Sequence, residues 1–241
     1  MKLFGLTGGI ACGKSTVEAA LRDATPPAIV IDADAVVHAA QRPGSRAVRK
    51  IAKVWPHCVD HATMTLDRAK LSAAVFEDRA QLRRLTALIR TDILWEFLLT
   101  LLRTWWAAPR DAIVVLSLPL LYEHGFWVFV VSGVVAVACD EPTQVKRLMT
   151  RNGYSEAEAR QRIAAQLPAA EKVRRANFVI RNDGNQPLAG VAAEARKAAA
   201  WMARQRTWHN GWNRLVAVAA ALLLAGGAAG TWAVRRALAH T

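Results

Sequence analysis

Short apolar runs recur along the chain, and each is followed by a polar or glycine-rich turn. Runs of this kind, bounded by turn residues, are typical of strands that are buried on both faces of a sheet. They predict five strands, at residues 2–6, 28–32, 113–116, 134–139 and 178–180. Helical patterns separate the runs, and this order predicts an α/β fold with a five-stranded parallel sheet and helices on both faces.

Helical spacing dominates residues 34–106, where Leu82, Leu85 and Leu88 recur at helical intervals. Charged residues such as Glu96 interrupt this segment before it reaches membrane length, so we expect soluble core helices. The other helices are expected at residues 14–22, after Asp140, after Ser155 and at 187–206. The tetrapeptide S-E-A-E at Ser155–Glu158 predicts a capping box, which is a strong signal for a helix start.

The chain has 241 residues and a formal net charge of +13, from 32 Lys and Arg against 19 Asp and Glu. This length suits one α/β domain with a sizeable core and an additional segment at one end. The positive charge favours an anionic partner: a nucleotide, a nucleic acid or an acidic membrane. Arginines are spread along the chain without a dense basic block, which disfavours nucleic acid. Cys12, Cys58 and Cys139 form no C-x-x-C motif, which favours a reducing compartment.

The first predicted strand runs directly into G-x-x-x-x-G-K-S, from Gly8 to Ser15, and a helix follows. Glycines let the backbone approach a phosphate without a Cβ clash, and the helix N-terminus adds partial positive charge. Lys14 can reach the β- and γ-phosphates, and the Ser15 hydroxyl can ligate Mg²⁺. In this strand–loop–helix context the motif predicts a nucleotide site rather than a tight turn with an exposed lysine.

Two absences in the sequence narrow the class of P-loop protein. A GTPase would carry an N-K-x-D motif for guanine, and none is present. An ATPase motor would end a strand with acidic residues, but Ser117 follows the third predicted strand. Small-molecule kinases remain, in which the loop is paired with an acceptor-binding helical insert and an arginine-bearing lid.

Asp32 and Asp34 follow the second predicted strand, at the edge of the sheet where ligands bind in open α/β folds. One carboxylate can position Mg²⁺ and its waters, and the other can accept a proton from an attacking hydroxyl. The two residues alone do not decide which carboxylate has which role. The alternative interpretation is a helix N-cap aspartate beside a solvated neighbour.

Arginines recur in the two helices that are expected after Asp140 and Ser155. Arg147 and Arg151 are four residues apart, so they share one face of their helix, and Arg160 follows on the next. A lid that closes over a transferring phosphoryl group needs residues of this kind. An ordinary solvated helical hairpin would show the same pattern.

Four blocks of sequence, in order between Lys2 and Gly184, resemble the dephospho-CoA kinase family. They are GLTGGIACGKST, VIDAD, LPLLYE, and RLMTRNGYSEAEARQRIAAQLPAAEK followed by NDG. The C-terminal layout is most similar to the animal dephospho-CoA kinase domain-containing proteins, which also end in an apolar segment. The resemblance implies transfer of the γ-phosphoryl group of ATP to the ribose 3′-hydroxyl of dephospho-CoA, the last step of coenzyme A synthesis.

The resemblance also implies roles for single residues. Asp34 matches the family's catalytic aspartate, Asp32 a supporting acid and Arg147 the lid arginine, and Gln166 falls at the end of the lid. The residues expected at ATP are Gly8, Gly9, Ala11, Cys12, Gly13, Lys14, Ser15, Thr16, Asn182 and Gly184, the last two near adenine. The expected catalytic residues are Lys14, Asp34, Asp32 and Arg147, the lid residues are Arg147, Arg151 and Gln166, and Mg²⁺ is expected at Ser15 and, through water, at Asp32.

Some positions depart from the family pattern. Ala11 replaces a usual glycine, and Arg90 and Thr91 replace a usual His-Pro pair in the acceptor-binding segment. The second departure leaves open another P-loop kinase, acting on a nucleoside, a nucleotide or a small alcohol. A nucleotide-binding scaffold without catalysis is the other alternative, although Lys14 and Asp34 are both present.

Leu215–Val234 is a run of 20 residues without a charge, with Arg214 before it and Arg235 after it. A helix of this length spans about 30 Å, the thickness of a bilayer's hydrocarbon core. The run is apolar on all sides rather than along one stripe, which favours a transmembrane helix over a buried C-terminal helix. Gly226 and Gly230 form G-x-x-x-G, a pattern through which such helices can pair.

The sequence therefore predicts a tail-anchored kinase. Its parts are a kinase domain at 1–206 with an acceptor-binding insert at about 36–106 and a lid at about 141–170, a linker at 207–214, a transmembrane helix at 215–234 and a tail at 235–241. The kinase domain is expected to face the cytosol. Modest hydrophobicity with flanking arginines favours the mitochondrial outer membrane over the secretory pathway and leaves another organelle open.

Overall fold

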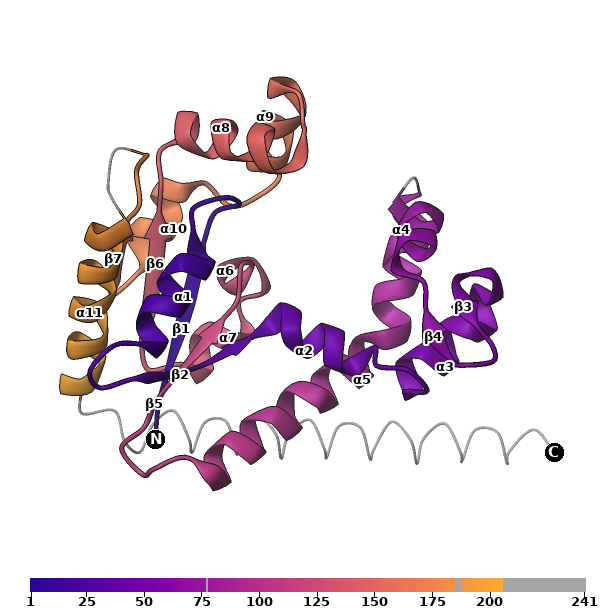
Figure 1. The fold of residues 1–241 in the computed structure, drawn as a ribbon, viewed down its shortest axis with the longest axis horizontal. Coiled ribbons are helices and arrows are strands. Elements are labelled where there is room, and N and C mark those ends of the chain that lie inside the picture. The colour runs from indigo at the N-terminus through magenta and orange to yellow at the C-terminus, as the bar shows by residue number, and fades with distance from the viewer. Residues whose placement is uncertain (77, 185–187, 206–241) are drawn as a thin grey trace. The chain divides into compact units, whose positions relative to one another are not determined.

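The computed structural model describes residues 1–76, 78–184 and 188–205 (Figure 1). The chain divides into two compact units, one formed by Met1–Val30 with the described residues from Pro109 onward, and the other by Ile31–Ala108. The expected linker, transmembrane helix and tail lie outside the described residues. None of the helices within the described part of the chain is long and apolar enough to cross a membrane.

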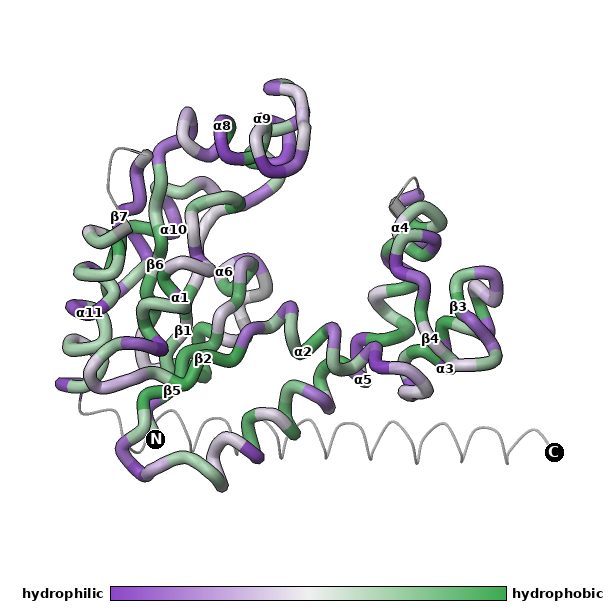
Figure 2. Tube along the Cα trace, in the orientation of Figure 1, coloured by the Kyte–Doolittle hydropathy of each residue, from purple (hydrophilic) through white to green (hydrophobic). Residues whose placement is uncertain are grey.

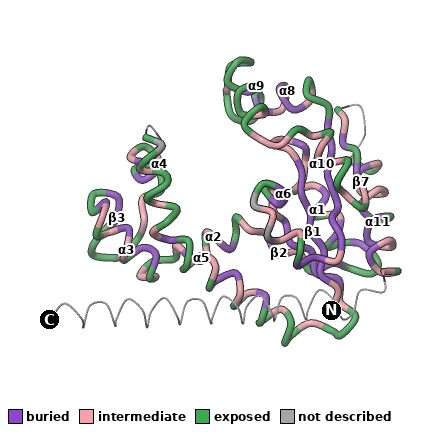
Figure 3. The backbone as a smooth tube through the Cα atoms, turned by 180° about the vertical axis from the view of Figure 1, so that it is seen from behind, coloured by how far each residue is buried: buried purple, intermediate pink, exposed green. Residues whose placement is uncertain are grey.

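A five-stranded parallel sheet in the order β2-β5-β1-β6-β7 forms the centre of the first unit. Its strands are β1 (Lys2–Gly8), β2 (Ala28–Asp32), β5 (Ile113–Ser117), β6 (Val134–Ala138) and β7 (Phe178–Arg181). β1 pairs in parallel with β5 and with β6, and β6 pairs in parallel with β7. These strands are continuous apolar runs, green in Figure 2, and the central ones are buried, as Figure 3 shows. The prediction of a parallel α/β sheet is therefore confirmed.

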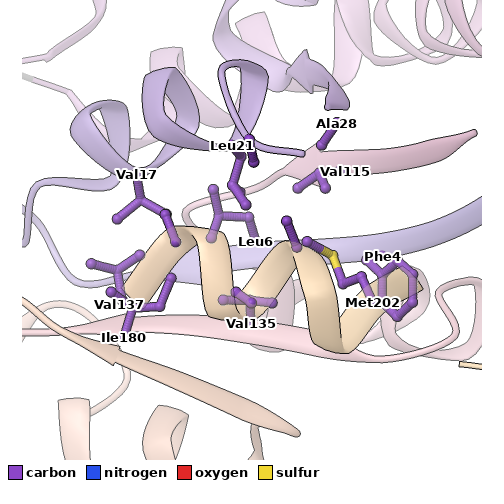
Figure 4. Packing of buried hydrophobic residues seen from close by; sticks show 14 of the residues in the cluster. Phe4, Leu6, Val17, Leu21, Ala28, Val115, Val135, Val137, Ile180 and Met202 are labelled. Carbon is purple, nitrogen blue, oxygen red and sulfur yellow. The ribbon is translucent and has the colours of Figure 1, made fainter. Parts of the chain in front are cut away.

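Successive side chains of β1 point to two different layers of helices. Phe4 packs in one cluster with Val17 of α1 and Met202 of α11 (Figure 4). Gly5 faces the other side, where a Cβ would lie 2.5 Å from a methyl group of Leu121 in α6. The helices of this unit are α1 (Lys14–Arg22), α6 (Leu121–His124), α7 (Phe126–Val130), α8 (Glu141–Asn152), α9 (Glu156–Ala164), α10 (Ala169–Arg175) and α11 (Leu188–Arg204).

Both helices of the α8–α9 hairpin begin with a side-chain cap. Asp140 accepts a hydrogen bond of 2.7 Å from the Thr143 N–H, and the bonds from Thr143 hold the pKa of Asp140 below its usual value. Ser155 and Glu158 form the predicted capping box at the start of α9. Gly153, with a φ of 69°, ends α8 in the left-handed conformation that favours glycine.

The second unit is mostly helical. It contains α2 (Ala33–Ala40), α3 (Arg46–Val54), the 3-10 turn η1 (Pro56–Cys58), β3 (Val59–Asp60), β4 (Thr65–Leu66), α4 (Arg68–Phe76) and α5 (Arg79–Ala107). α2, α3 and α4 all contact the long helix α5. Ile51 and Trp55 lie in the core of this unit.

The antiparallel hairpin of β3 and β4 was not predicted, because the sequence analysis assigned this whole region to helices. Each strand has only two residues, which is too short to show a periodic pattern. The turn is held by Asp60, whose carboxylate accepts hydrogen bonds from Ala62 N and from the Thr63 hydroxyl, at 2.9 and 2.7 Å.

Candidate active site

The predicted glycine loop connects β1 to α1 in the first unit. Ala11 and Gly13 have left-handed backbone conformations, with φ values of 59° and 83°. A Cβ at Gly13 would lie 2.0 Å from Asn182 Nδ2, so this position needs glycine for space as well as for conformation. Gly13 is the N-cap of α1, and no side chain in the described chain caps this helix. The first N–H groups of α1 therefore remain available to an anion.

Three side chains from outside the loop hold its backbone. Gln144 Nε2 donates a hydrogen bond of 2.7 Å to Ile10 O, and Ile10 N donates one of 3.0 Å to Gln166 Oε1. Asn182, which is 5% exposed, donates from Nδ2 to Cys12 O over 2.8 Å. The protein itself therefore fixes the shape of the loop.

Arg147 reaches the same loop from α8. Its Nη1 atom donates to Ala11 O over 3.2 Å, and its Nη2 atom donates to Asn182 Oδ1 over 3.3 Å. Arg151 is exposed at the end of the same helix, where it donates to the neighbouring Asn152 over 2.9 Å. Of the two arginines that the sequence analysis expected in a lid, Arg147 contacts the loop and Arg151 lies at the surface.

The other expected residues of the loop have distinct surroundings. A Cβ at Gly8 would lie 2.9 Å from Val137 O, so this glycine allows the loop to pass close to β6. Ser15 is exposed in the first turn of α1, and Thr16 is half-buried. Gly184, beyond β7, donates its N–H to the Thr143 hydroxyl over 3.2 Å.

Lys14 belongs to a small polar cluster at the end of β5. Its ammonium group lies 2.7 Å from Glu18 Oε1 and also donates to the Ser117 hydroxyl, which in turn donates to Glu18. Glu18 is 5% exposed. The sequence shows no acidic residue at the end of β5, but in the structure Glu18 of α1 places a carboxylate there. The sequence analysis missed Glu18, although its spacing of four residues from Lys14 is a recognised signal.

Asp32 and Asp34 belong to the second unit. Asp32 is the last residue of β2 and the N-cap of α2, where its Oδ1 atom accepts a hydrogen bond of 3.0 Å from Asp34 N. Asp34 is exposed in the first turn of α2. The N-cap interpretation therefore applies to Asp32, and the carboxylate of Asp34 faces solvent.

Residues 2–187 match the family model described as dephospho-CoA kinase. The chain belongs to the dephospho-CoA kinase family. It is 41% identical over 190 residues to the dephospho-CoA kinase of Geobacillus kaustophilus, with 76% of this chain and 89% of the relative covered. It is 39% identical over 186 residues to a dephospho-CoA kinase domain-containing protein of Danio rerio, with 77% and 80% covered.

Solved structures give the same answer for the fold. A protein from Thermus thermophilus superposes with a TM-score of 0.67 at 32% identity, with 83% of this chain and 96% of that chain covered. The dephospho-CoA kinase from Campylobacter jejuni superposes with a TM-score of 0.60 at 21% identity, with 85% and 98% covered. The predictions of a P-loop kinase fold and of membership in this family are confirmed.

Two blocks that resemble the family, LPLLYE and the AEK that follows the lid, meet through a salt bridge that the sequence analysis did not predict. Lys172, only 2% exposed, places its ammonium group 2.9 Å from Glu123 Oε1 and donates to Pro119 O over 3.1 Å. Burial raises the pKa of Glu123, but hydrogen bonds from Lys172 and from the Leu167 N–H outweigh burial and hold the pKa below its usual value. Thr7 also donates to Pro119 O, so this pair is tied to the end of β1.

Proposed function

We propose that this chain transfers the γ-phosphoryl group of ATP to the ribose 3′-hydroxyl of dephospho-CoA, which gives coenzyme A and ADP. The observation that carries this proposal is the glycine loop. The helix that follows it, α1, starts at Lys14 and has no side-chain cap, and Arg147 and Asn182 hold the loop through its carbonyl oxygens. Named kinases that share about 40% identity over most of their length support the same acceptor.

A direct test incubates the full-length chain with ATP, Mg²⁺ and dephospho-CoA and separates the products by liquid chromatography and mass spectrometry. A product with the mass and retention time of authentic coenzyme A supports the proposal. Release of ADP without this product contradicts it.

We assign the ATP phosphates to the loop. The N–H groups at the start of α1 would donate to phosphate oxygens, and Lys14 would supply positive charge to the β- and γ-phosphates. Glu18 and Ser117 position the Lys14 ammonium group, since they hold it by hydrogen bonds. Arg147, already in contact with the loop, stabilises the charge on the transferring group.

The residues present fit a Mg²⁺ ion. The Ser15 hydroxyl is exposed in the first turn of α1, and Asp32 offers a hard carboxylate oxygen. Mg²⁺ takes few ligands from a protein and fills its remaining positions with phosphate oxygens and water, so in the first unit Ser15 would hold it. A contact through water with Asp32, which belongs to the second unit, stays a prediction. When bound, the ion supplies positive charge that neutralises the β- and γ-phosphates.

Asp34 is the proposed general base. Its carboxylate is exposed, so it is free to accept the proton of the attacking 3′-hydroxyl. Asp32 fixes the start of α2 by its capping bond to Asp34 N, and in this way it orients the proposed base.

We also propose that residues 215–234 anchor the chain in a membrane, with the linker at 207–214 and the kinase domain, up to residue 206, in the cytosol. The supporting observation is the uncharged run of 20 residues between Arg214 and Arg235. The mitochondrial outer membrane is the proposed location, because the segment is only modestly hydrophobic and arginines flank it.

The anchor is tested with Leu223→Arg and with truncation after Asn210, and Leu223→Ile is the matched control. A charge at the centre of a spanning helix costs roughly 2.5–3.5 kcal/mol on insertion scales, so the first two changes should move the protein into the carbonate-soluble fraction. Each variant is also assayed as a kinase, and activity should persist. A full-length protein that is soluble in carbonate contradicts the anchor.

Pairing of two copies through Gly226 and Gly230 is the last part of this proposal. Small residues four apart let two helices approach closely. Replacing both glycines by leucine should abolish cross-linking in detergent micelles, whereas Gly227→Leu, off the same face, should not. Equal cross-linking of the wild type, the double variant and Gly227→Leu would contradict pairing through Gly226 and Gly230.

A further inference from the structure

Two of the three cysteines lie together beside the glycine loop. Cys12, in the loop, is 1% exposed, and Cys139, directly after β6, is 5% exposed. Both belong to the same buried cluster of the first unit, and Arg147 Nη1 reaches both segments, since it donates to Ala11 O over 3.2 Å and to Cys139 Sγ over 3.6 Å. Cys58 is buried in the separate core of the second unit. The fold thus forms one thiol pair and leaves the third cysteine apart from it.

The two sulfur atoms have different polar neighbours. Arg147 Nη1 donates to Cys139 Sγ over 3.6 Å, whereas the uncharged Gln144 Nε2 donates to Cys12 Sγ over 3.3 Å. The hydrogen bond from Cys12 lowers the pKa of Cys139, and the Arg147 cation lowers it further, against the effect of burial. The same hydrogen bond, together with burial, raises the pKa of Cys12. Cys139 is therefore the more acidic thiol of the two, and the one that gives the thiolate more readily.

A cavity lies against one residue of this pair, Cys139. Cys139 and Asp140 line a cavity of about 450 Å³, together with Arg174 and Arg181. A water molecule takes about 30 Å³ of liquid, so a molecule of the size of hydrogen peroxide fits easily. Cys139 lines this cavity and Cys12 does not, so Cys139 is the cysteine nearer to an oxidant that enters it.

We propose that Cys12 and Cys139 form an oxidation site, which reacts with a peroxide and closes an intramolecular disulfide between the glycine loop and β6. The Cys139 thiolate attacks one peroxide oxygen, a sulfur–oxygen bond forms, the O–O bond breaks, and the leaving hydroxide takes up a proton to become water. Cys12 then attacks the sulfenic sulfur, so that the S–S bond forms and the second oxygen leaves as water with the Cys12 proton. Two thiols lose two electrons and two protons, and one hydrogen peroxide becomes two waters.

The disulfide changes the conformation of the glycine loop. Both cysteines are free, and the sulfur atoms of a disulfide lie only about 2.05 Å apart, closer than any non-bonded contact, so one segment has to move. β6 is paired on both sides, with β1 and β7, and so the loop moves. Cys12 lies between the left-handed residues Ala11 and Gly13, and Asn182 holds its carbonyl group, so a shift disturbs the conformation that meets the phosphates. This consequence rests on the proposed ATP site, whereas the disulfide itself does not.

The test treats the reduced, full-length chain with hydrogen peroxide, blocks remaining thiols with N-ethylmaleimide, and digests with trypsin without reductant. The expected product joins the peptide Leu3–Lys14 to the peptide Asp111–Lys146, with a mass two hydrogens below their sum. Kinase activity should fall by roughly tenfold to a hundredfold, because small displacements of positioning groups have effects of this size. A thiol reductant should restore it.

Cys139→Ser and Cys58→Ser are the matched variants, each compared with its own activity before oxidation. Cys58→Ser should lose activity as the wild type does, and Cys139→Ser should keep its activity and give no linked peptide. Because the linked peptide is read from the unchanged chain, it does not depend on the folding of any variant. Absence of that peptide, or equal inactivation of wild type and Cys139→Ser, would overturn the oxidation site. A linked peptide with undiminished activity would retain the site and instead contradict the assignment of the loop to ATP.

Discussion

The ammonium group of Lys172, only 2% exposed, lies 2.9 Å from Glu123 Oε1 and links α10 to α6. A buried ion is costly unless it is paired, so removal of one partner destabilises the fold. Lys172→Met should lower the free energy of unfolding by about 3 kcal/mol, at the lower end of the usual range because the Glu123 side chain is 22% exposed. Urea denaturation monitored by circular dichroism measures the change.

Lys197→Met is the control for that variant. Lys197 pairs with Glu194 at 2.7 Å, but its side chain is 68% exposed on α11. An exposed pair contributes less than about 1 kcal/mol, so this variant should be close to the wild type. Equal losses in the two variants would contradict the importance of burial.

The same salt bridge predicts a pH dependence. The pKa of Glu123 in the folded chain is held below its ordinary value of 4.5. A carboxyl group with a lowered pKa stabilises the fold above its unfolded pKa, and this contribution is lost as the pH falls through the folded value. The difference in stability between the wild type and Glu123→Gln should be constant near neutrality and shrink below about pH 4.5. A difference that grows on acidification, in urea titrations between neutral and acidic pH, would show that the sign is wrong.

Gly13 and Ala11 allow a comparison within the loop. Gly13→Ala places a Cβ 2.0 Å from Asn182 Nδ2 at a φ of 83°, so it should weaken ATP binding and lower stability by at least about 1–2 kcal/mol. Ala11→Gly removes a Cβ from a left-handed position, with a φ of 59°, and should leave stability within about 1 kcal/mol of the wild type. Thermal unfolding with and without ATP measures both effects. An ATP-dependent shift of wild-type size in Gly13→Ala would argue against this loop as the ATP site.

The two aspartates are separated by their asparagine variants. Asp34→Asn should keep ATP binding but reduce turnover by roughly 10² or more, as losses of a general base do. Asn also caps helices well, so Asp32→Asn keeps the start of α2 and removes only the charge. Its activity should recover in part as Mg²⁺ is raised. Wild-type turnover in Asp34→Asn together with inactivity of Asp32→Asn would reverse the two roles.

The strands, the loop and the capping box could be predicted because each has a local signal in the sequence. Apolar runs mark the buried strands, and the glycine spacing marks a turn that the backbone confirms at Gly13. The pairs Lys172–Glu123 and Cys12–Cys139 have no such signal, since their partners come together only through the parallel sheet and its crossovers. The hairpin of β3 and β4 was missed because its strands are too short for a period to appear.

The central claim is the identity of the phosphoryl acceptor. Arg90 and Thr91, which depart from the family pattern, are exposed on α5, and Lys50 Nζ lies 3.4 Å from the Thr91 hydroxyl. Because these two positions leave the acceptor open, the test offers the full-length chain several acceptors at equal concentration, together with ATP and Mg²⁺. The acceptors are dephospho-CoA, nucleosides, nucleoside monophosphates and small sugar alcohols, and every phosphorylated product is quantified by mass spectrometry. Lys14→Ala, whose fold is checked by its unfolding curve, is the matched control. We predict that the wild type phosphorylates dephospho-CoA more than any other acceptor and that Lys14→Ala phosphorylates none. Turnover of only a different acceptor, or near-normal turnover in Lys14→Ala, would contradict the account.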